Sequence, residues 1–198
     1  MEKPEKLYKY RSLEDFSKVE DILVKRRLWA SYFNELNDPK EGIFYFADGD
    51  FVPARINQIS NDKQSNMVCS LSEDPENDLM WTFYANKHRG IVIEVELEKD
   101  EELKLHQVNY ISLNEFKEQD GDHIDAKYLL TRKTLDWQYE KDWRVLTDSN
   151  HVKVKVTGII KGERADPKAI EELEELIRDY KLTFKIKDRK PVWLGQKK

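Results

Sequence analysis

The chain has 198 residues, of which 37% are charged and 39% hydrophobic, and its formal net charge at pH 7 is −5. Five Trp, nine Tyr and eight Phe supply large side chains for a core, which excludes a disordered chain, and the length fits a single domain over residues 1–198. The negative charge argues against a general attraction of the whole molecule to polyphosphates.

The single cysteine, Cys69, excludes an internal disulfide and a cysteine-rich metal site. The N-terminal stretch MEKPEKLYKY contains no apolar run typical of a signal peptide, and no segment approaches the roughly 20 apolar residues that cross a bilayer. We therefore expect a cytoplasmic protein with no membrane partner.

In the N-terminal half, hydrophobic alternation and buried-strand composition predict strands at 7–11, 28–32, 67–71 and 91–97. A helix is expected after Ser12 as its N-cap, with Phe16, Val19, Ile22 and Leu23 on one face. Residues 34–42 have turn composition around Asn37-Asp38-Pro39, and 50–66 are expected to be a loop or a short helix. Asp74-Pro75 is typical of a helix start, and Gly90 of the end of that helix.

In the C-terminal half, segments with period-two hydrophobicity predict strands at 139–146, 152–159 and 182–186. A short helix is expected over 124–130. Asp166 and Pro167 begin a further helix, whose inward residues are expected to be Ile170, Leu173, Leu176, Ile177 and Tyr180. Half-polar strands favour antiparallel pairing, so the predicted class is α+β, with a mainly antiparallel sheet, single or divided in two, and helices packed on it.

Two basic runs, Lys25-Arg26-Arg27 and 185–190, are interpreted as solvated surface. The first segment that could carry chemistry is Tyr8-Lys9-Tyr10-Arg11, an aromatic and cationic strand that leads into a helix N-terminus. Arginine and free helix N–H groups together favour an anion site at Tyr8 and Arg11. The alternative is that the two tyrosines pack in the sheet while Lys9 and Arg11 face water.

The second segment runs from Cys69 to Gly90. On a helix, Trp81, Tyr84 and His88 share one face, and this face could form a stacking wall for a flat ring with His88 at its rim. The alternative is that Trp81 and Tyr84 belong to the core and that His88 is hydrogen-bonded nearby.

The third segment is Trp137 to Arg144. In a strand, Glu140, Asp142 and Arg144 project to one face, with the two carboxylates about 7 Å apart. Two neighbouring acids either raise one pKa or recruit a cation, and both outcomes are useful in catalysis. The alternative is a solvated strand face on which Arg144 neutralises its neighbours.

Several other chemistries are not indicated. The four histidines have no zinc-ligand spacing, the seven glycines form no phosphate-binding loop, and no nucleophile elbow is present. Nothing in the sequence marks Cys69 as an activated nucleophile. No metal is expected.

Taken in order, these segments resemble the bacterial family called domain of unknown function 2971. The resemblance extends over most of the chain and rests on the following segments: 7–11, Asn37-Asp38-Pro39 with Glu41, 69–72, 79–90, Trp137 and 140–144. A membership in this family implies a bacterial protein and suggests a role in defence or in a toxin system.

The order of the segments is also similar to that of ADP-ribosyltransferases of the Arg–Ser–Glu type, in which an arginine holds NAD, a serine strand braces the site and two acids catalyse. This resemblance implies an ADP-ribosyltransferase-like fold, NAD as substrate, and Glu140 and Asp142 as the catalytic acids. The implied NAD-binding residues are Tyr8, Arg11, Ser70, Trp81, Tyr84 and His88. In this sequence the serine motif is Ser70-Leu71-Ser72, and the second acid is an aspartate.

The resemblance thus implies an NAD-dependent ADP-ribosyltransferase or NAD glycohydrolase, with a protein, nucleic acid or small molecule as acceptor. Three alternatives remain open. One is a metal-dependent nuclease or phosphodiesterase in which Asp38, Glu41, Glu140 and Asp142 surround Mg²⁺. Another is a non-catalytic module whose aromatic face recognises a nucleotide or base. The third is an interaction protein with no small-molecule site. The sequence does not indicate an oligomeric state.

Overall fold

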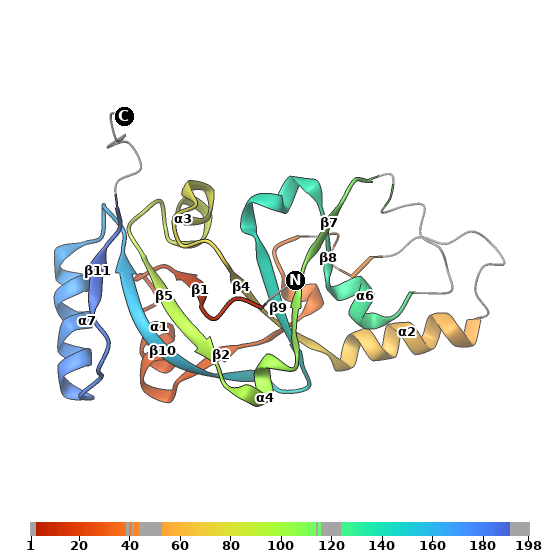
Figure 1. The fold of residues 1–198 in the computed structure, drawn as a ribbon, viewed down its shortest axis with the longest axis horizontal. Coiled ribbons are helices and arrows are strands. Elements are labelled where there is room, and N and C mark those ends of the chain that lie inside the picture. Colours follow the sequence, from red (N-terminus) through yellow and green to blue (C-terminus); the bar gives the residue numbers. More distant parts are fainter. Residues whose placement is uncertain are drawn as a thin grey trace. The chain divides into compact units, whose positions relative to one another are not determined.

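The computed structural model describes residues 3–38, 40, 42–43, 53–113, 115 and 124–190 (Figure 1). The chain forms two compact units, each assembled from separate parts of the sequence. The first unit comprises Met1–Arg27, Ser72–Glu98 and Lys153–Lys198, and the second comprises Leu28–Leu71 and Lys99–Val152.

The first unit contains a sheet in which four strands lie side by side: β11 (Ile186–Asp188), β10 (His151–Lys161), β5 (Ile91–Leu97) and β1 (Leu7–Arg11). β1 and β10 both pair antiparallel with β5, whereas β11 pairs parallel with β10. The strands predicted at 7–11, 91–97 and 152–159 are confirmed. The strand predicted at 182–186 begins only at its last residue, because Leu182 N bonds back to Ile177 O.

Helix α7 (Pro167–Asp179) begins as predicted, with Asp166 accepting a hydrogen bond from Lys168 N at 2.9 Å. It lies beside β10 and β11 in Figure 1. Ile170 and Leu173 are buried as predicted, whereas Tyr180 follows the helix and is 50% exposed. The helix therefore covers the sheet with fewer of its apolar residues than predicted.

Helix α1 (Phe16–Lys25) starts later than predicted. Ser12 does not cap it, because its hydroxyl accepts a local hydrogen bond from Glu14 N, and the chain turns three residues further before becoming helical. The buried face consists of Val19, Ile22 and Leu23, as the 3.6-residue periodicity predicts.

Helix α3 (Asp78–Tyr84) is shorter than the helix predicted between Asp74 and Gly90. Its N-cap is Asn77, whose side-chain oxygen accepts hydrogen bonds from Leu79 N and Met80 N. The helix ends at Tyr84 because the next turn is left-handed: Asn86, Lys87 and His88 have φ angles of 47°, 54° and 68°. His88 consequently does not share a helical face with Trp81 and Tyr84, and that prediction was wrong.

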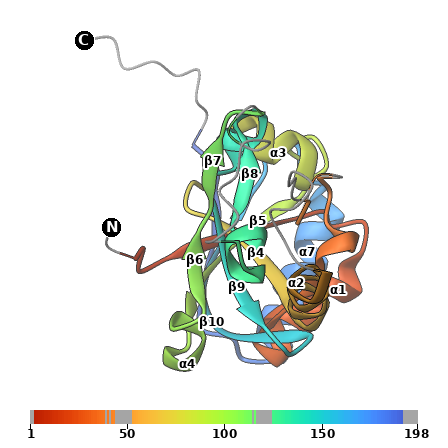
Figure 2. The same ribbon diagram turned by 90° about the vertical axis from the view of Figure 1, so that its right-hand side faces the viewer.

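In the second unit, β9 (Asp142–Thr147) lies between β4 (Met67–Ser72) and β6 (Leu105–Gln107), and β3 (Ser31–Tyr32) pairs antiparallel with β4. β7 (Asn109–Ile111) and β8 (Arg132–Thr134) form a parallel pair. Figure 2 shows β6 beside β9, with which it pairs antiparallel. The strand predicted at 67–71 is confirmed. The strand predicted at 28–32 is interrupted at Ala30, which separates β2 (Arg27–Trp29) from β3.

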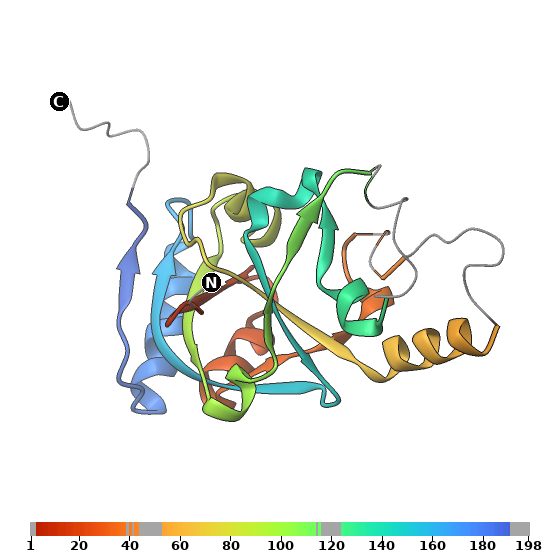
Figure 3. The same ribbon diagram turned by 45° about the vertical axis from the view of Figure 1, so that its right-hand side comes forward.

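Helix α2 (Pro53–Ser65) occupies most of the segment expected to be a loop or a short helix. It buries Ile59 against Ile124 and Leu129, next to the confirmed short helix α6 (Ala126–Leu130) (Figure 3). Because Ile59 is the one residue of α2 that is buried, the polar sequence showed no helical periodicity of apolar residues. Shorter elements complete the unit: α4 (Lys99–Glu102) and the 3₁₀ helices η1 (Phe33–Glu35) and η3 (Leu135–Glu140).

The predicted class, α+β with a mainly antiparallel sheet and packed helices, is confirmed, since β1–β4, β1–β5, β5–β10, β3–β4 and β6–β9 are antiparallel pairs, whereas β10–β11 and β7–β8 are parallel. Among the described residues, no helix is both long enough and apolar enough to cross a membrane.

Candidate functional site

The two predicted catalytic acids do not lie on one regular strand. Glu140 is the last residue of η3, Lys141 adopts the left-handed conformation with φ 46°, and β9 begins at Asp142. The strand predicted at 139–146 is therefore confirmed only from Asp142 onward, and the predicted strand face that carries both acids about 7 Å apart was wrong. Both acids nevertheless belong to one buried cluster of charged side chains.

The cluster is formed by four charged side chains that are almost inaccessible to solvent: Lys133, Glu140, Asp142 and Arg144, with exposed fractions of 2%, 4%, 3% and 0%. The alternative of a solvated strand face is therefore also wrong. Two cations and two carboxylates balance one another, which is how proteins make charge burial tolerable. We call these four residues the acid cluster.

Lys133 connects the two acids. Its Nζ hydrogen-bonds to Oε2 of Glu140, lies 3.4 Å from Oδ2 of Asp142 and is 5.3 Å from the centre of the Trp137 ring. Sequence reasoning missed Lys133, because one lysine in a short strand has the same pattern as a solvated lysine. Only its tertiary environment shows that the ammonium group belongs to the acids.

Arg144 fixes the other side of Asp142. Its Nε donates to Oδ2 of Asp142 at 3.0 Å, and its Nη1 donates to the carbonyl oxygen of Leu130 at 2.6 Å. The two residues are separated by one position on β9 and so project to the same face of the strand.

Ser70 and Tyr110 complete the surroundings of Asp142. The Ser70 hydroxyl on β4 donates to Oδ2 of Asp142 at 3.4 Å, across adjacent strands. The Tyr110 hydroxyl accepts a hydrogen bond from Asp142 N at 2.7 Å. Burial, and secondarily the charge of Asp142, raises the pKa of Tyr110 well above its ordinary value, so this phenol stays protonated. The structure thus brings Ser70, Glu140 and Asp142 together in the second unit.

The other predicted NAD-binding residues, Tyr8, Arg11, Trp81, Tyr84 and His88, belong to the first unit. Trp81 is fully buried and donates from Nε1 to the Pro75 carbonyl oxygen at 2.8 Å, as the core alternative expected. Tyr8, Arg11 and Tyr84 are partly exposed, and burial raises the pKa of Tyr8. Their predicted role in holding NAD stays a prediction.

Arg189 is the most unexpected residue of the first unit. It lies in the basic run that was interpreted as solvated surface, yet only 3% of it is exposed, so that interpretation was wrong for this residue. Its guanidinium lies 5.1 Å from the centre of the Trp81 ring, and its Nη1 lies 2.7 Å from Nδ1 of His88. The His88 ring in turn stacks on Trp81, at a centroid distance of 6.1 Å.

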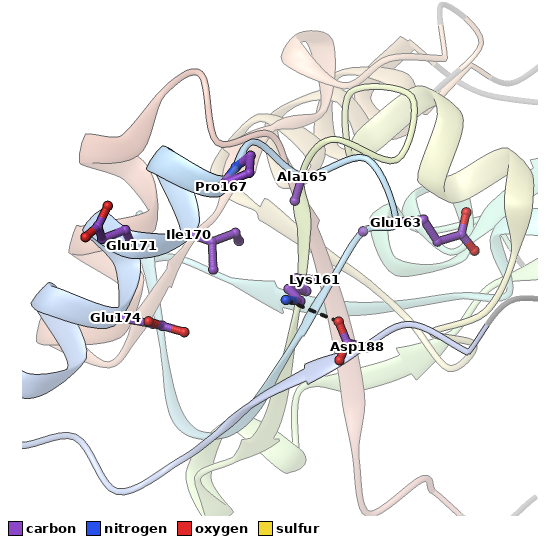
Figure 4. A pocket seen from close by; sticks show the side chains of 9 residues that line it. Lys161, Glu163, Ala165, Pro167, Ile170, Glu171, Glu174 and Asp188 are labelled. Carbon is purple, nitrogen blue, oxygen red and sulfur yellow. Dashed lines mark ion pairs between the residues drawn. The ribbon is translucent and has the colours of Figure 1, made fainter.

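A hollow of about 420 Å³ lies between α7, β10 and β11, also within the first unit (Figure 4). Four acidic side chains and one lysine contribute to its lining, together with apolar residues: Lys161, Glu163, Glu171, Glu174 and Asp188, with Ala165, Pro167 and Ile170. Lys161 pairs with Asp188 at 3.2 Å. The predicted site residues are not among those that line this hollow.

The alternative with a metal ion concerned Asp38, Glu41, Glu140 and Asp142. Asp38 is buried and accepts a hydrogen bond from Lys40 N at 2.9 Å, whereas Pro39 and Glu41 lie outside the described residues. Over the described ranges, no three His, Cys, Asp or Glu side chains come together in a group that could hold a metal ion. Cys69, the predicted unactivated thiol, is buried and free of a disulfide.

Comparison of the chain with protein-family models, with curated proteins and with solved structures gives no match. The resemblance to domain of unknown function 2971 and to ADP-ribosyltransferases stays a prediction.

Proposed function

We propose that this chain is an NAD-consuming enzyme of the ADP-ribosyltransferase kind, acting as a transferase or a glycohydrolase with Glu140 and Asp142 as its acids. The observation that supports the proposal is the contact between Ser70 and Asp142, at 3.4 Å on adjacent strands. A serine strand beside the acid strand is the arrangement that the resemblance implies for the reaction centre.

The carboxylates of Glu140 and Asp142 suit the cleavage of the bond between nicotinamide and ribose. When the bond between nicotinamide and ribose C1′ breaks, its electron pair leaves with nicotinamide, and positive charge develops on the ribose ring. A carboxylate close to the ring stabilises this charge and orients the acceptor or water that attacks C1′, as in glycoside hydrolysis. The attacking group loses its proton to a carboxylate or to water.

In the proposed reaction, the side chain of Lys133 has to move. Its ammonium group hydrogen-bonds to Glu140 and lies near Asp142, so a cation already compensates the acids. A bound substrate whose ribose becomes cationic has to displace Lys133 Nζ from Glu140. Arg144 can remain on Asp142, because it contacts the carboxylate from the strand itself.

The test combines NAD titration by calorimetry with a measurement of nicotinamide release. We expect the wild-type protein to release nicotinamide, and Glu140→Gln and Asp142→Asn to bind NAD without releasing it. Asp136→Asn serves as the matched control, because Asp136 lies in the same 3₁₀ helix as Glu140 but is exposed. Circular dichroism and thermal unfolding establish that each variant is folded.

A second candidate, a nucleotide-binding module without catalysis, is favoured by the burial of the acids, which are 4% and 3% exposed and paired with Lys133 and Arg144. In that case the wild-type protein binds a nucleotide but releases no nicotinamide. Retained binding in Glu140→Gln together with no turnover in the wild type would select this function over the enzyme.

A further inference from the structure

The side chain of Arg189 ties the end of β11 to the start of α3. Its backbone N–H donates to Lys161 O at 3.1 Å, directly after β11. Its Nη2 donates to the carbonyl oxygen of Glu76 at 2.7 Å and to Oδ1 of Asp78 at 2.6 Å. The side chain is 1% exposed, so solvent cannot replace these contacts.

The contact with His88 defines the protonation state of its ring. Arginine has only donors, so the 2.7 Å contact between Nη1 and Nδ1 is a hydrogen bond only if Nδ1 is the acceptor. The imidazole is then neutral, with its proton on Nε2. Oε2 of Glu163 lies 3.7 Å from the same Nδ1 atom, which is too long for a hydrogen bond in this state.

The backbone holds His88 in place while its ring is free to change partner. His88 is the third of three consecutive left-handed residues, its N–H donates to Trp81 O at 3.2 Å, and its carbonyl accepts from Arg164 N at 3.0 Å. Stacking on Trp81, with an angle of 14° between the planes, fixes the plane of the ring. Nδ1 therefore stays between the two candidate partners, Arg189 and Glu163.

We propose that His88, Arg189 and Glu163 form an acid-sensitive latch. Neutral His88 accepts from Arg189 and helps to hold the end of β11. Protonated His88 can no longer accept, and it faces a second cation at short range. The imidazolium therefore leaves Arg189 and donates to Glu163, and the tie between the end of β11 and α3 loosens.

The charged groups around the ring support this exchange. His88 is in contact with Glu163, Arg164 and Arg189. Glu14 binds Asn86 of the same loop, and Glu76 and Asp78 pair with Arg189. Oε1 of Glu163 already lies 3.6 Å from Nη1 of Arg189, so this carboxylate is shared by the two cations once His88 is protonated, while Asp78 and Glu76 continue to neutralise Arg189. Histidine is the side chain that most readily gains a charge in mild acid, so lowering the pH favours this exchange.

The latch also reaches the hollow beside α7. Glu163 is one of the side chains that line it (Figure 4). In Figure 4 the Glu163 carboxylate points away from Lys161 and Asp188, so pairing with protonated His88 needs only a short movement of this side chain. Acid thus loosens the attachment of β11.

The experiment uses the full chain and two NMR measurements. Long-range ¹H–¹⁵N correlations report the tautomer of His88, and we expect the proton on Nε2 at about pH 8. Hydrogen exchange of the Arg189 amide is then followed as the pH is lowered. We expect its protection factor to fall about tenfold between about pH 8 and 5, because this local opening becomes easier.

His88→Asn is the matched control. The asparagine oxygen can accept from Arg189 near the position of Nδ1, asparagine tolerates the left-handed conformation, and it does not titrate. We expect this variant to keep the Arg189 amide protected at both ends of the pH range. Glu163→Gln keeps the hydrogen bond between Arg189 and neutral His88, although it removes the carboxylate 3.6 Å from Nη1 of Arg189. Because the anion that receives the imidazolium is then missing, the loss of protection should move to lower pH.

Three results would overturn the proposal: a proton on Nδ1 of His88 at high pH, a constant protection factor in the wild-type protein, or the same loss of protection in His88→Asn. If His88→Asn does not fold, the tautomer of the wild-type ring and the behaviour of Glu163→Gln still decide the question.

Discussion

Arg144 donates from Nε to Oδ2 of Asp142 at 3.0 Å, and both side chains are buried. A buried charge is stable only while its partner is present, because water cannot replace the partner. The acid cluster is therefore both the candidate reaction centre and a point at which the second unit can be broken by one substitution.

Arg144→Met tests this. The substitution keeps much of the side-chain volume but leaves Asp142 without its guanidinium partner, and we expect the free energy of unfolding in urea to fall by about 3–5 kcal/mol. Arg178→Met is the control, because Arg178 is 63% exposed and makes only a 3.8 Å ion pair with Glu175; it should change stability by less than about 0.5 kcal/mol. An effect of Arg144→Met as small as that of the control would show that the cluster does not stabilise the fold.

The pairing of Lys133 with Glu140 predicts strong coupling between these two residues. Lys133→Met and Glu140→Leu should each destabilise the protein, because each leaves one buried charge without its main partner. The double variant removes both charges and should be more stable than the sum of the single effects by about 1–3 kcal/mol. Urea unfolding of the four proteins measures this energy, and strictly additive effects would contradict the pairing.

The sequence predicted those elements whose cause is local. The alternation of Ile91, Ile93, Val95 and Leu97 predicted β5, and Asp166-Pro167 predicted the start of α7, because both patterns act over a few residues. The acid pair was recognised as chemically important, but its geometry was not, since a left-handed lysine between two acids leaves no pattern.

Burial of single charged residues was the other feature that the sequence could not show. Arg189 is buried by contacts with Glu76, Asp78 and His88, which lie more than 100 residues earlier in the chain. Lys133 is buried by an acid seven residues away, across a 3₁₀ helix of which only the last two residues were predicted to be strand. Both lysine and arginine are most often exposed, so only the tertiary fold identifies the exceptions.

Gly162 and Gly158 should respond differently to alanine. At Gly162 an added Cβ would lie 2.1 Å from the carbonyl oxygen of His88, a backbone atom that cannot move alone. At Gly158 the nearest atom is Oε1 of Glu94 at 3.5 Å, which is ordinary contact. We expect Gly162→Ala to lower the free energy of unfolding by about 1–3 kcal/mol or more, and the melting temperature with it. Gly158→Ala should be nearly neutral, and equal effects of both substitutions would contradict the close approach at His88.

Asp21 should contribute to stability in a pH-dependent way. Its carboxylate accepts from Nε and Nη2 of Arg27, at 3.0 and 2.9 Å, and pairs with Lys25 at 2.7 Å. Arg27 first, and then Lys25, lowers the pKa of Asp21 to about 2. Because the folded pKa lies below the value of about 3.9 in an unfolded chain, the stabilisation is fully present above about pH 4 and is lost as the pH falls towards 2.

Asp21→Asn measures this contribution. The Asp21 side chain is 33% exposed, and solvent screens the pair, so we expect a loss of about 1 kcal/mol or less at pH 7. Urea unfolding at several pH values should show the difference from wild type shrinking steadily as the pH falls from about 4 through 2. Arg27→Gln should reproduce most of the loss, and adding it to Asp21→Asn should cost little more, because the shared interaction is already absent. A difference of the same size at pH 7 and pH 2 would assign the effect to helix packing instead of the ion pair.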